Sequence, residues 1–286
     1  MSKQPKLDQF YTKPSIVEKV LSMIDCSRYE LVLEPSAGAG DFLERLPKAT
    51  RVGVDLEPAH PEVTQQDFFD YVPHLDTTSI LTIGNPPFGK NSSLAVRFFN
   101  HAASFSDCIA FIVPRTFRKP SLINRLDDNF HIVSQEILPL DAFYLPSGES
   151  YKVPTVFQVW GKKDYKREKI KTETEHKDFE FMKLSHGGLH PTKSYFEQCQ
   201  AADFCVQRVG VNAGEVYNNT DKTRYGKYRD WKSHYFIKEN TANVRSNMES
   251  IDWNYNESPK FDNAGNPSIS KHELIKAYIK AKENNG

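Results

Sequence analysis

The stretch LVLEPSAGAGDFLERL, residues 31–46, decides the fold. It opens with three apolar residues, as a buried strand would. Gly38 and Gly40 then let the backbone turn sharply and approach a ligand closely, and a helix-compatible segment follows. A strand, a glycine loop and a helix in this order are typical of a ligand-binding turn in an α/β domain. Because many strand–helix turns carry glycines for packing alone, the interpretation depends on the surrounding sequence.

Short apolar runs recur through the first 160 residues and alternate with helix-compatible segments. The apolar runs are residues 31–33, 51–54, 80–83, 108–113, 131–138 and 155–160, and the helix-compatible segments are 14–24, 41–46, 92–104 and 120–128. Continuous apolar strands that alternate with helices favour a parallel sheet covered on both faces. We therefore expect an open α/β fold, which binds its ligand at the carboxyl ends of the strands.

After Gly161 the sequence changes character. A charge-dense run predicts a solvated connection, and the residues from 179 to about 257 hold short β-like pieces broken by Gly, Asn and Asp. Ser270 and Glu273 form the capping-box pattern at the start of a C-terminal helix. We expect two parts: an α/β domain over residues 1–163 and a smaller mixed α+β region over residues 164–286.

The composition favours a protein that is cytoplasmic or nucleoid-associated and not secreted. The chain has 286 residues and a net charge of zero. No apolar run reaches the roughly 18 residues of a membrane span, and the N-terminus lacks the apolar region of a secretory signal. The four cysteines form no C-x-x-C pair, so the sequence indicates neither a zinc site nor any other metal site. Isolated cysteines are typical of a reducing compartment.

Three acids stand at the ends of three successive predicted strands. Glu34 ends the first, Asp55 ends the second, and Asp67 follows the third with Phe68 beside it. A carboxylate at the second position can accept hydrogen bonds from both ribose hydroxyls, and one at the third can accept from an adenine amino group while the aromatic ring packs on the base. Any one of these acids is more often a loop residue or a helix N-cap. No lysine follows the glycines as in a P-loop, and Glu34 and Asp41 would repel a pyrophosphate. The pattern predicts an adenosine ligand of neutral or positive charge.

Four motifs carry a resemblance to a known family. EPSAGAGDF (34–42), VGVD (52–55), DF (67–68) and NPPF (85–88), in this order and spacing, closely resemble the S-adenosyl-L-methionine-dependent amino methyltransferases that act on adenine N6. The segment DQFYTKP (8–14) resembles the family's N-terminal motif, which caps the methionine end of the cofactor. The motif order is similar to the gamma arrangement of DNA adenine methylases. The resemblance covers about residues 8–163 and implies a Rossmann-like class I methyltransferase fold with a seven-stranded, mostly parallel sheet and an antiparallel last strand.

The resemblance also implies a catalytic set and a cofactor set. The catalytic set is Asn85, Pro86, Pro87 and Phe88. The set that binds S-adenosyl-L-methionine is Tyr11, Thr12, Pro14, Glu34, Pro35, Ser36, Ala37, Gly38, Gly40, Asp55, Leu56, Asp67, Phe68 and Asn85. The side-chain oxygen of Asn85 and the carbonyl of Pro86 would accept both N6 hydrogens and favour a more nucleophilic nitrogen, and Phe88 would stack on the flipped base. The methyl group would then move in line from the sulfonium to N6 without a metal. A Pro-Pro strand terminator would explain the prolines but not the flanking Asn and Phe. The family commonly has tyrosine where this chain has Phe88, but phenylalanine also occurs there. The phenol is therefore dispensable for stacking.

Several cations and aromatic residues are candidates for contacting a nucleic-acid substrate. The window from Lys222 to Lys238 interleaves cations with aromatic residues, which suits phosphate contacts and base stacking, although a charge run is usually a solvated face. In the family, an aromatic residue in the segment before the last strand often stacks on the second face of the target base, and Phe143, Tyr144 and Tyr151 are candidates. The predicted substrate-binding residues are Lys90, Arg115, Arg118, Lys119, Tyr144, Lys227, Arg229 and Trp231.

The motif NPP(Y/F) leaves the acceptor open. It is shared by enzymes that methylate adenine in DNA, adenine or guanine in RNA, and the glutamine side chain of proteins. A glutamine methylase would more often carry its extra domain before the cofactor motifs, where this chain has only about thirty residues. A non-catalytic binding module is a further alternative, which the intact Asn85 and acids disfavour. We rank DNA adenine first, then RNA adenine, then protein glutamine, and the oligomeric state stays open.

Overall fold

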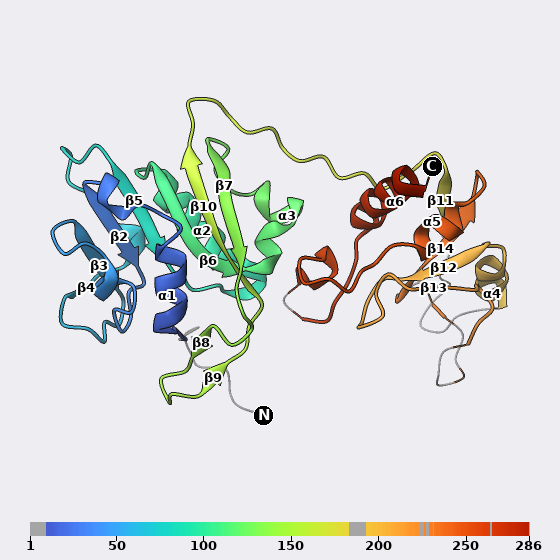
Figure 1. Cartoon of the computed structure of the whole chain (residues 1–286), viewed down its shortest axis with the longest axis horizontal. Helices are drawn as coiled ribbons and strands as arrows, with labels where there is room; N and C mark the ends of the chain where they lie inside the picture. The colour runs from blue at the N-terminus through green and yellow to red at the C-terminus, as the bar shows by residue number, and fades with distance from the viewer. Residues whose placement is uncertain are drawn as a thin grey trace. The chain divides into compact units, whose positions relative to one another are not determined.

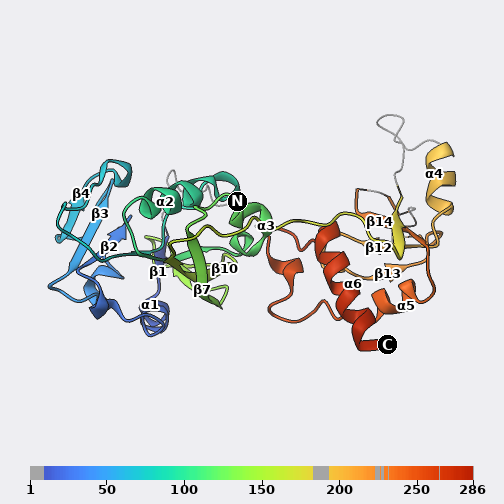
Figure 2. The same ribbon diagram turned by 90° about the horizontal axis from the view of Figure 1, so that it is seen from above.

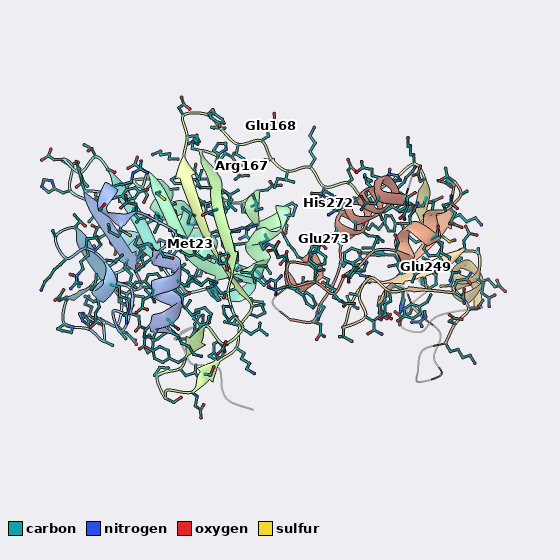
Figure 3. The ribbon with its side chains drawn as sticks, in the orientation of Figure 1. Met23, Arg167, Glu168, Glu249, His272 and Glu273 are labelled. Atoms are coloured by element: carbon teal, nitrogen blue, oxygen red, sulfur yellow. The ribbon has the colours of Figure 1, made fainter. Side chains whose placement is uncertain are left out.

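The computed structural model describes residues 10–182, 193–222, 226, 229–230, 232–263 and 265–285. The chain divides into two compact units, Met1–Ile170 and Lys171–Gly286 (Figure 1). The first unit extends seven residues beyond the boundary predicted at residue 163, because the segment after the last strand is bonded to it. Arg167, labelled on that segment in Figure 3, donates to the carbonyls of Phe130 (3.2 Å) and Ile123 (3.0 Å).

A seven-stranded sheet forms the centre of the first unit. Its spatial order is β4-β3-β2-β5-β6-β10-β7. β10 runs antiparallel to both of its neighbours, whereas the pairs from β4 to β6 are parallel. This topology confirms the expected Rossmann-like class I methyltransferase fold. The strands are β2 (Leu31–Pro35), β3 (Arg51–Asp55), β4 (Val63–Gln65), β5 (Ile80–Gly84), β6 (Cys108–Pro114), β7 (Phe130–Ile137) and β10 (Thr155–Lys162).

Helices cover both faces of this sheet. α1 (Pro14–Leu21) lies on one face, and α2 (Ser93–Ala103) and α3 (Pro120–Ile123) lie on the other (Figure 2). Successive strand residues therefore pack in opposite directions: Val32 joins the cluster under α1, and Leu33 joins the cluster under α2. Burial on both faces explains why the strands are continuous apolar runs rather than alternating ones.

All four predicted helical segments are shorter in the structure: α1 ends three residues early and α2 loses one residue at each end, whereas the other two differ more. The segment expected to be helical at 41–46 forms only one 3-10 turn, Leu43–Arg45. Only six residues separate Gly40 from Pro47, which is too few to offset the cost of nucleating an α-helix, and the proline disfavours helical geometry in the residue before it. α3 ends at Ile123, five residues before the predicted end at residue 128. The remaining 3-10 turns are Cys26–Arg28, Phe68–Asp70, Lys90–Ser92, Arg115–Arg118 and Pro259–Phe261.

A second, three-stranded sheet lies at the carboxyl end of the parallel strands (Figure 1). It consists of β1 (Tyr11–Thr12) and a hairpin of β8 (Phe143–Tyr144) and β9 (Ser150–Tyr151), which lies in the segment before the last strand. β1 pairs antiparallel with β8, placing Tyr11 opposite Tyr144, a contact that the sequence did not predict. An ion pair between Lys13, which follows β1, and Asp141, which precedes β8, also connects these two segments (2.9 Å).

The second unit has its own sheet and core. Its strands, in the antiparallel order β11-β14-β12-β13, are Phe179–Phe181, His234–Glu239, Phe204–Gln207 and Val216–Tyr217. Its helices are α4 (Lys193–Gln200), α5 (Val244–Glu249) and α6 (Lys271–Asn285). The predicted capping box of α6 is confirmed, since the Glu273 amide donates to Ser270 Oγ (3.2 Å) and the Ser270 amide donates to the Glu273 carboxylate (2.6 Å). Figure 3 labels Glu273 at the first turn of this helix.

A buried carboxylate ties β11 to α6. The side chain of Asp178 is 4% exposed and accepts hydrogen bonds from Lys282 Nζ (2.7 Å) and the Tyr278 hydroxyl (2.8 Å). These bonds, with that from Lys282 the stronger influence, hold the pKa of Asp178 below its ordinary value. Among the described residues, no helix is long and apolar enough to cross a membrane.

Candidate functional site

The first unit contains a cavity of about 510 Å³ where the strand order reverses. β2 and β5 are neighbours, but the chain passes outward through β3 and β4 before it returns to β5. Such a switch point opens a crevice at the carboxyl ends of the strands. The predicted site residues that line the cavity are Tyr11, Thr12, Glu34, Ser36, Ala37, Gly38, Asp55, Leu56, Asp67, Phe68, Asn85 and Pro87. The other residues that line it are Phe10, Asp41, Phe42, Glu57, Gln66, Phe69, Leu94 and Phe98.

The glycine loop is held in place by backbone hydrogen bonds and by close side chains. Gly38 has φ +50°, and its amide donates to Asp55 Oδ2 (2.8 Å), while the other Asp55 oxygen accepts from the Glu57 amide (2.8 Å). A Cβ on Gly38 would lie 3.0 Å from the Tyr11 ring. Gly40 does not line the cavity. It has φ +82°, and a Cβ there would lie 2.8 Å from the His60 ring. Both positions therefore require glycine.

Five carboxyl groups line the cavity, and no lysine or arginine is among the described residues that do so. They are Glu34, Asp41, Asp55, Glu57 and Asp67. Glu34 is only 3% exposed, and burial raises its pKa well above the ordinary value. Its Oε2 has no hydrogen-bond partner among the described residues. Partial burial also raises the pKa of Asp41. A cavity of this kind suits a ligand that carries positive charge and donates hydrogen bonds.

Aromatic rings form the part of the cavity next to Asp67. Asp67 caps the 3-10 turn that follows it by accepting from the Phe69 amide (2.9 Å), the structural role that a single acid of this kind often has. Phe68 is 3% exposed and packs on Phe98, with ring centroids 4.9 Å apart. The guanidinium of Arg97 lies over the Phe69 ring at 4.3 Å.

The NPPF turn is fixed between β5 and the start of α2. The carbonyl of Phe88 accepts hydrogen bonds from the amides of Leu94 (3.2 Å) and Ala95 (3.3 Å). Asn85 lines the cavity, and its Oδ1 is buried without a hydrogen-bond partner among the described residues. A buried acceptor without a donor is costly, so an oxygen of this kind is a candidate contact for a ligand.

The ring of Phe88 is covered in this structure. It is 8% exposed and meets Phe10 edge-on at 5.1 Å. Phe10 also contacts Phe143 (4.9 Å) and Tyr151 (5.2 Å). The structure therefore brings Phe88 and the hairpin aromatics to one place, with Phe10 between them. Phe88, Pro86, Pro14 and Pro35 do not line the cavity.

The predicted substrate-binding cations of the first unit lie outside the cavity. Lys90 is exposed after the NPPF turn. Arg115 is 6% exposed and so is buried within the protein. Arg118, on the same 3-10 turn after β6, and Lys119, which follows that turn, are partly exposed. Tyr144 also does not line the cavity; its hydroxyl donates to Asp41 Oδ2 (2.9 Å).

In the second unit, one of the three predicted contact residues is described. Arg229 lies over the Tyr217 ring at 3.3 Å, and its Nη1 is 3.1 Å from Nε2 of the buried His234, whose pKa burial lowers to about 4. The Nε of Arg229 is buried without a partner among the described residues. Lys227 and Trp231 lie outside the described residues.

Eight of the described residues that line the cavity were not in the predicted site set, and two of them matter most for the arguments below: Asp41, which the sequence indicated only as a charge that would repel a pyrophosphate, and Phe10. Asp41 directly follows the second loop glycine, and that adjacency was the available signal. Phe10 lies within the N-terminal motif but has no signal of its own, because only the pairing of β1 with β8 brings it to the cavity. The described residues include no group of three or more His, Cys, Asp and Glu side chains that could hold a metal ion.

No family model and no curated protein matches this sequence. Among solved structures, the chain is similar to a Pyrococcus horikoshii protein provisionally assigned as an RNA methyltransferase, with 19% identity, a TM-score of 0.40, and coverage of 56% of this chain and 91% of that one. It is also similar to the 23S rRNA methyltransferase ErmE, with 14% identity, a TM-score of 0.39, and coverage of 55% and 71%. A third similar structure is the N-methyltransferase NodS from Bradyrhizobium japonicum, with 12% identity, a TM-score of 0.37, and coverage of 52% and 96%.

Proposed function

We propose that this chain is an S-adenosyl-L-methionine-dependent methyltransferase that methylates adenine N6 in nucleic acid, with DNA the favoured substrate. The observation that carries the proposal is the buried Oδ1 of Asn85, which has no hydrogen-bond partner in the described part of the chain and lies in a carboxylate-lined cavity at the strand switch point. An acceptor amine would give this oxygen the hydrogen bond that it lacks. The resemblance of NPPF and the upstream motifs to amino methyltransferases supplies the chemistry.

The cavity suits this cofactor in charge and in shape. The cofactor carries a sulfonium and an ammonium against one carboxylate, so its net charge is positive, as the five carboxyl groups favour. Asp55 would accept from the ribose hydroxyls, and Asp67 would accept from the adenine amino group beside the rings of Phe68 and Phe69. The volume of about 510 Å³ lies within the range of small-molecule sites.

When bound, the cofactor supplies an electrophilic methyl group. Asn85 Oδ1 and the Pro86 carbonyl would accept the two N6 hydrogens of the acceptor and hold the nitrogen in line with that methyl. The hydrogen bonds from the start of α2 to the Phe88 carbonyl hold the turn that carries these acceptors. The acceptors therefore need little reorganisation as positive charge develops on nitrogen. Methyl transfer would leave the nitrogen with one proton more than the product keeps, and Asn85 Oδ1 and the Pro86 carbonyl would hold the N6 hydrogens until that proton is lost to solvent.

The acceptor base would take the place that Phe10 holds beside Phe88. Phe88 can stack on a base only after Phe10 moves away, because Phe10 lies against its ring. Phe143 and Tyr151, which also contact Phe10, would then line the same space. We propose residues 164–286 as the region that recognises the nucleic acid, with Lys90, Arg118 and Lys119 of the first unit as phosphate contacts beside the site.

The test is methyl transfer by the purified full chain with S-adenosyl-L-methionine labelled on the methyl group. The acceptors are duplex DNA, single-stranded DNA, RNA and a glutamine-containing peptide, and digestion followed by mass spectrometry identifies the product. We expect N6-methyladenine in DNA. If N6-methyladenine forms in RNA alone, the substrate is RNA instead of DNA, and the proposed reaction at adenine N6 stands. Label only in the peptide would overturn the adenine assignment. Cofactor binding without transfer to any of the four would make the chain a binding module.

A further inference from the structure

Asp41 occupies a defined place in the cavity wall, immediately after the second loop glycine. Its Oδ2 accepts a hydrogen bond from the Tyr144 hydroxyl (2.9 Å), and its main-chain carbonyl accepts from Arg45 Nη1 (2.9 Å). The side chain is thus held from the hairpin and the backbone is held from the following turn. Tyr144 uses Oδ2, and the other carboxylate oxygen, which accepts no hydrogen bond from the residues that the structure describes, can accept one from a ligand.

The cavity has two distinguishable ends. Phe68, Phe69 and Phe98 pack on one another at one end, beside Asp67. The strand order β4-β3-β2 gives the direction to the other end, since Asp67 lies after β4 and Asp41 lies after β2, where its carboxylate accepts from the Tyr144 hydroxyl. Asp55 lies between them, bonded to the Gly38 amide. An adenosine with its base at the aromatic end therefore extends its 5′ substituent toward Asp41.

Asp41 is better suited than Glu34 to pair with a cation. Glu34 is almost fully buried, and burial favours its neutral form. Asp41 is only partly buried: burial raises its pKa, and the hydrogen bond from Tyr144 partly offsets this by stabilising the charged form. The Oε2 of Glu34, for which the described residues offer no hydrogen-bond partner, is an independent sign that a polar ligand belongs at this wall.

We infer that Asp41 binds the α-ammonium group of the cofactor's amino acid, and that Tyr144 is a positioning residue that holds the Asp41 carboxylate for this contact. The inference rests on the proposed cofactor. It moves Tyr144 from the substrate-binding set to the cofactor site, so that the hairpin which borders the acceptor also orients a cofactor contact. It also gives the cavity a specificity element for ligands that carry an amino acid.

The test compares two ligands that differ only at the 5′ end. S-adenosylhomocysteine carries the α-ammonium group, whereas 5′-methylthioadenosine is the same adenosine thioether without the amino acid. Isothermal titration calorimetry gives the dissociation constant of each for the wild type, Asp41→Asn, Tyr144→Phe and Asp55→Asn. Asp41→Asn keeps an oxygen for the Tyr144 hydrogen bond and removes the charge.

We expect Asp41→Asn to raise the dissociation constant of S-adenosylhomocysteine about 10- to 100-fold, the loss expected for one charged hydrogen bond. The dissociation constant of 5′-methylthioadenosine should change by less than about 2-fold. Tyr144→Phe should produce a smaller loss of affinity, and only for S-adenosylhomocysteine. General damage to the loop would instead weaken the binding of both ligands. Asp55→Asn is the matched control, since a ribose contact should affect both ligands equally.

Equal weakening of both ligands by Asp41→Asn, or no weakening of either, would overturn the role of Asp41 while leaving the cofactor intact. A wild-type protein that binds neither ligand would overturn the proposed cofactor and the role of Asp41 with it. The Tyr144→Phe ratio decides the positioning role even if Asp41→Asn does not fold.

Discussion

Replacing Asn85 with alanine should separate catalysis from stability. Asn85 Oδ1 is buried and has no hydrogen-bond partner among the described residues. Removing it deletes an acceptor that is used only when the acceptor amine is present. Loss of one preorganised hydrogen-bonding group at a site of developing charge typically lowers kcat about 100- to 1,000-fold, or roughly 3–4 kcal/mol.

The same substitution should cost the folded protein little. An unpartnered buried polar atom already carries a penalty of about 1–3 kcal/mol, and this relief offsets the packing that the shorter side chain loses. We expect Tm to stay within about 3 °C of the wild type or to rise.

Asn100→Ala is the matched control. Its amide donates to the Arg125 carbonyl (2.9 Å) and accepts from the Asp127 amide (2.9 Å), away from the NPPF turn. Removing these bonds should cost about 1–2 kcal/mol and lower Tm by several degrees, with kcat unchanged. The assays are single-turnover methyl transfer and thermal denaturation by circular dichroism. Unchanged transfer in Asn85→Ala would refute the catalytic role of this side chain, and a lower Tm than that of Asn100→Ala would refute the claim that its oxygen is unpartnered.

Three further predictions concern the framework around the site. Asp178, whose pKa is lowered mainly by its bond from Lys282, stabilises the second unit above its unfolded pKa of about 4, and this contribution is lost as the pH falls through the lower folded value. Asp178→Asn should lower the free energy of unfolding, measured by urea denaturation, by about 3 kcal/mol at pH 7 and by less at acid pH. An equal loss at every pH would contradict this. Gly89→Ala should reduce cofactor binding measured by calorimetry, because Gly89 has φ +67° and a Cβ would lie 2.7 Å from that of Leu94. Ser270→Ala should remove one side of the α6 capping box and cost about 1 kcal/mol in the same denaturation assay, with cofactor affinity unchanged.

The sequence predicted those parts of the fold and cavity that depend on local patterns. Apolar runs mark the central strands because both sheet faces are buried. Asp55 and Asn85 were located because Asp55 ends, and Asn85 directly follows, a strand whose end could be predicted. The capping box of α6 could likewise be predicted, because its two residues are only three positions apart in the sequence.

The rest depends on contacts between distant segments. β1 is only two residues long and has no strand signal of its own; it exists because the hairpin offers it hydrogen bonds. The same pairing brings Phe10 against Phe88 and Tyr144 to Asp41, neither of which any spacing rule predicts. Arg115 shows the converse, since a cation near the site in sequence is buried in the fold.

The Tyr144–Asp41 hydrogen bond joins residues 103 positions apart, which has a consequence for biosynthesis. A nascent chain that has reached only β5 already has its glycine loop and its carboxylates, but not the hairpin whose Tyr144 holds the Asp41 carboxylate. At translation rates of about 5–20 residues per second, the hairpin follows Asp41 by roughly 5 to 20 seconds. Cofactor binding should therefore begin only after the hairpin has left the ribosome, and S-adenosyl-L-methionine would then stabilise the completed first unit by mass action. In a series of stalled chains, the appearance of cofactor affinity would mark the moment at which the two ends of this unit meet.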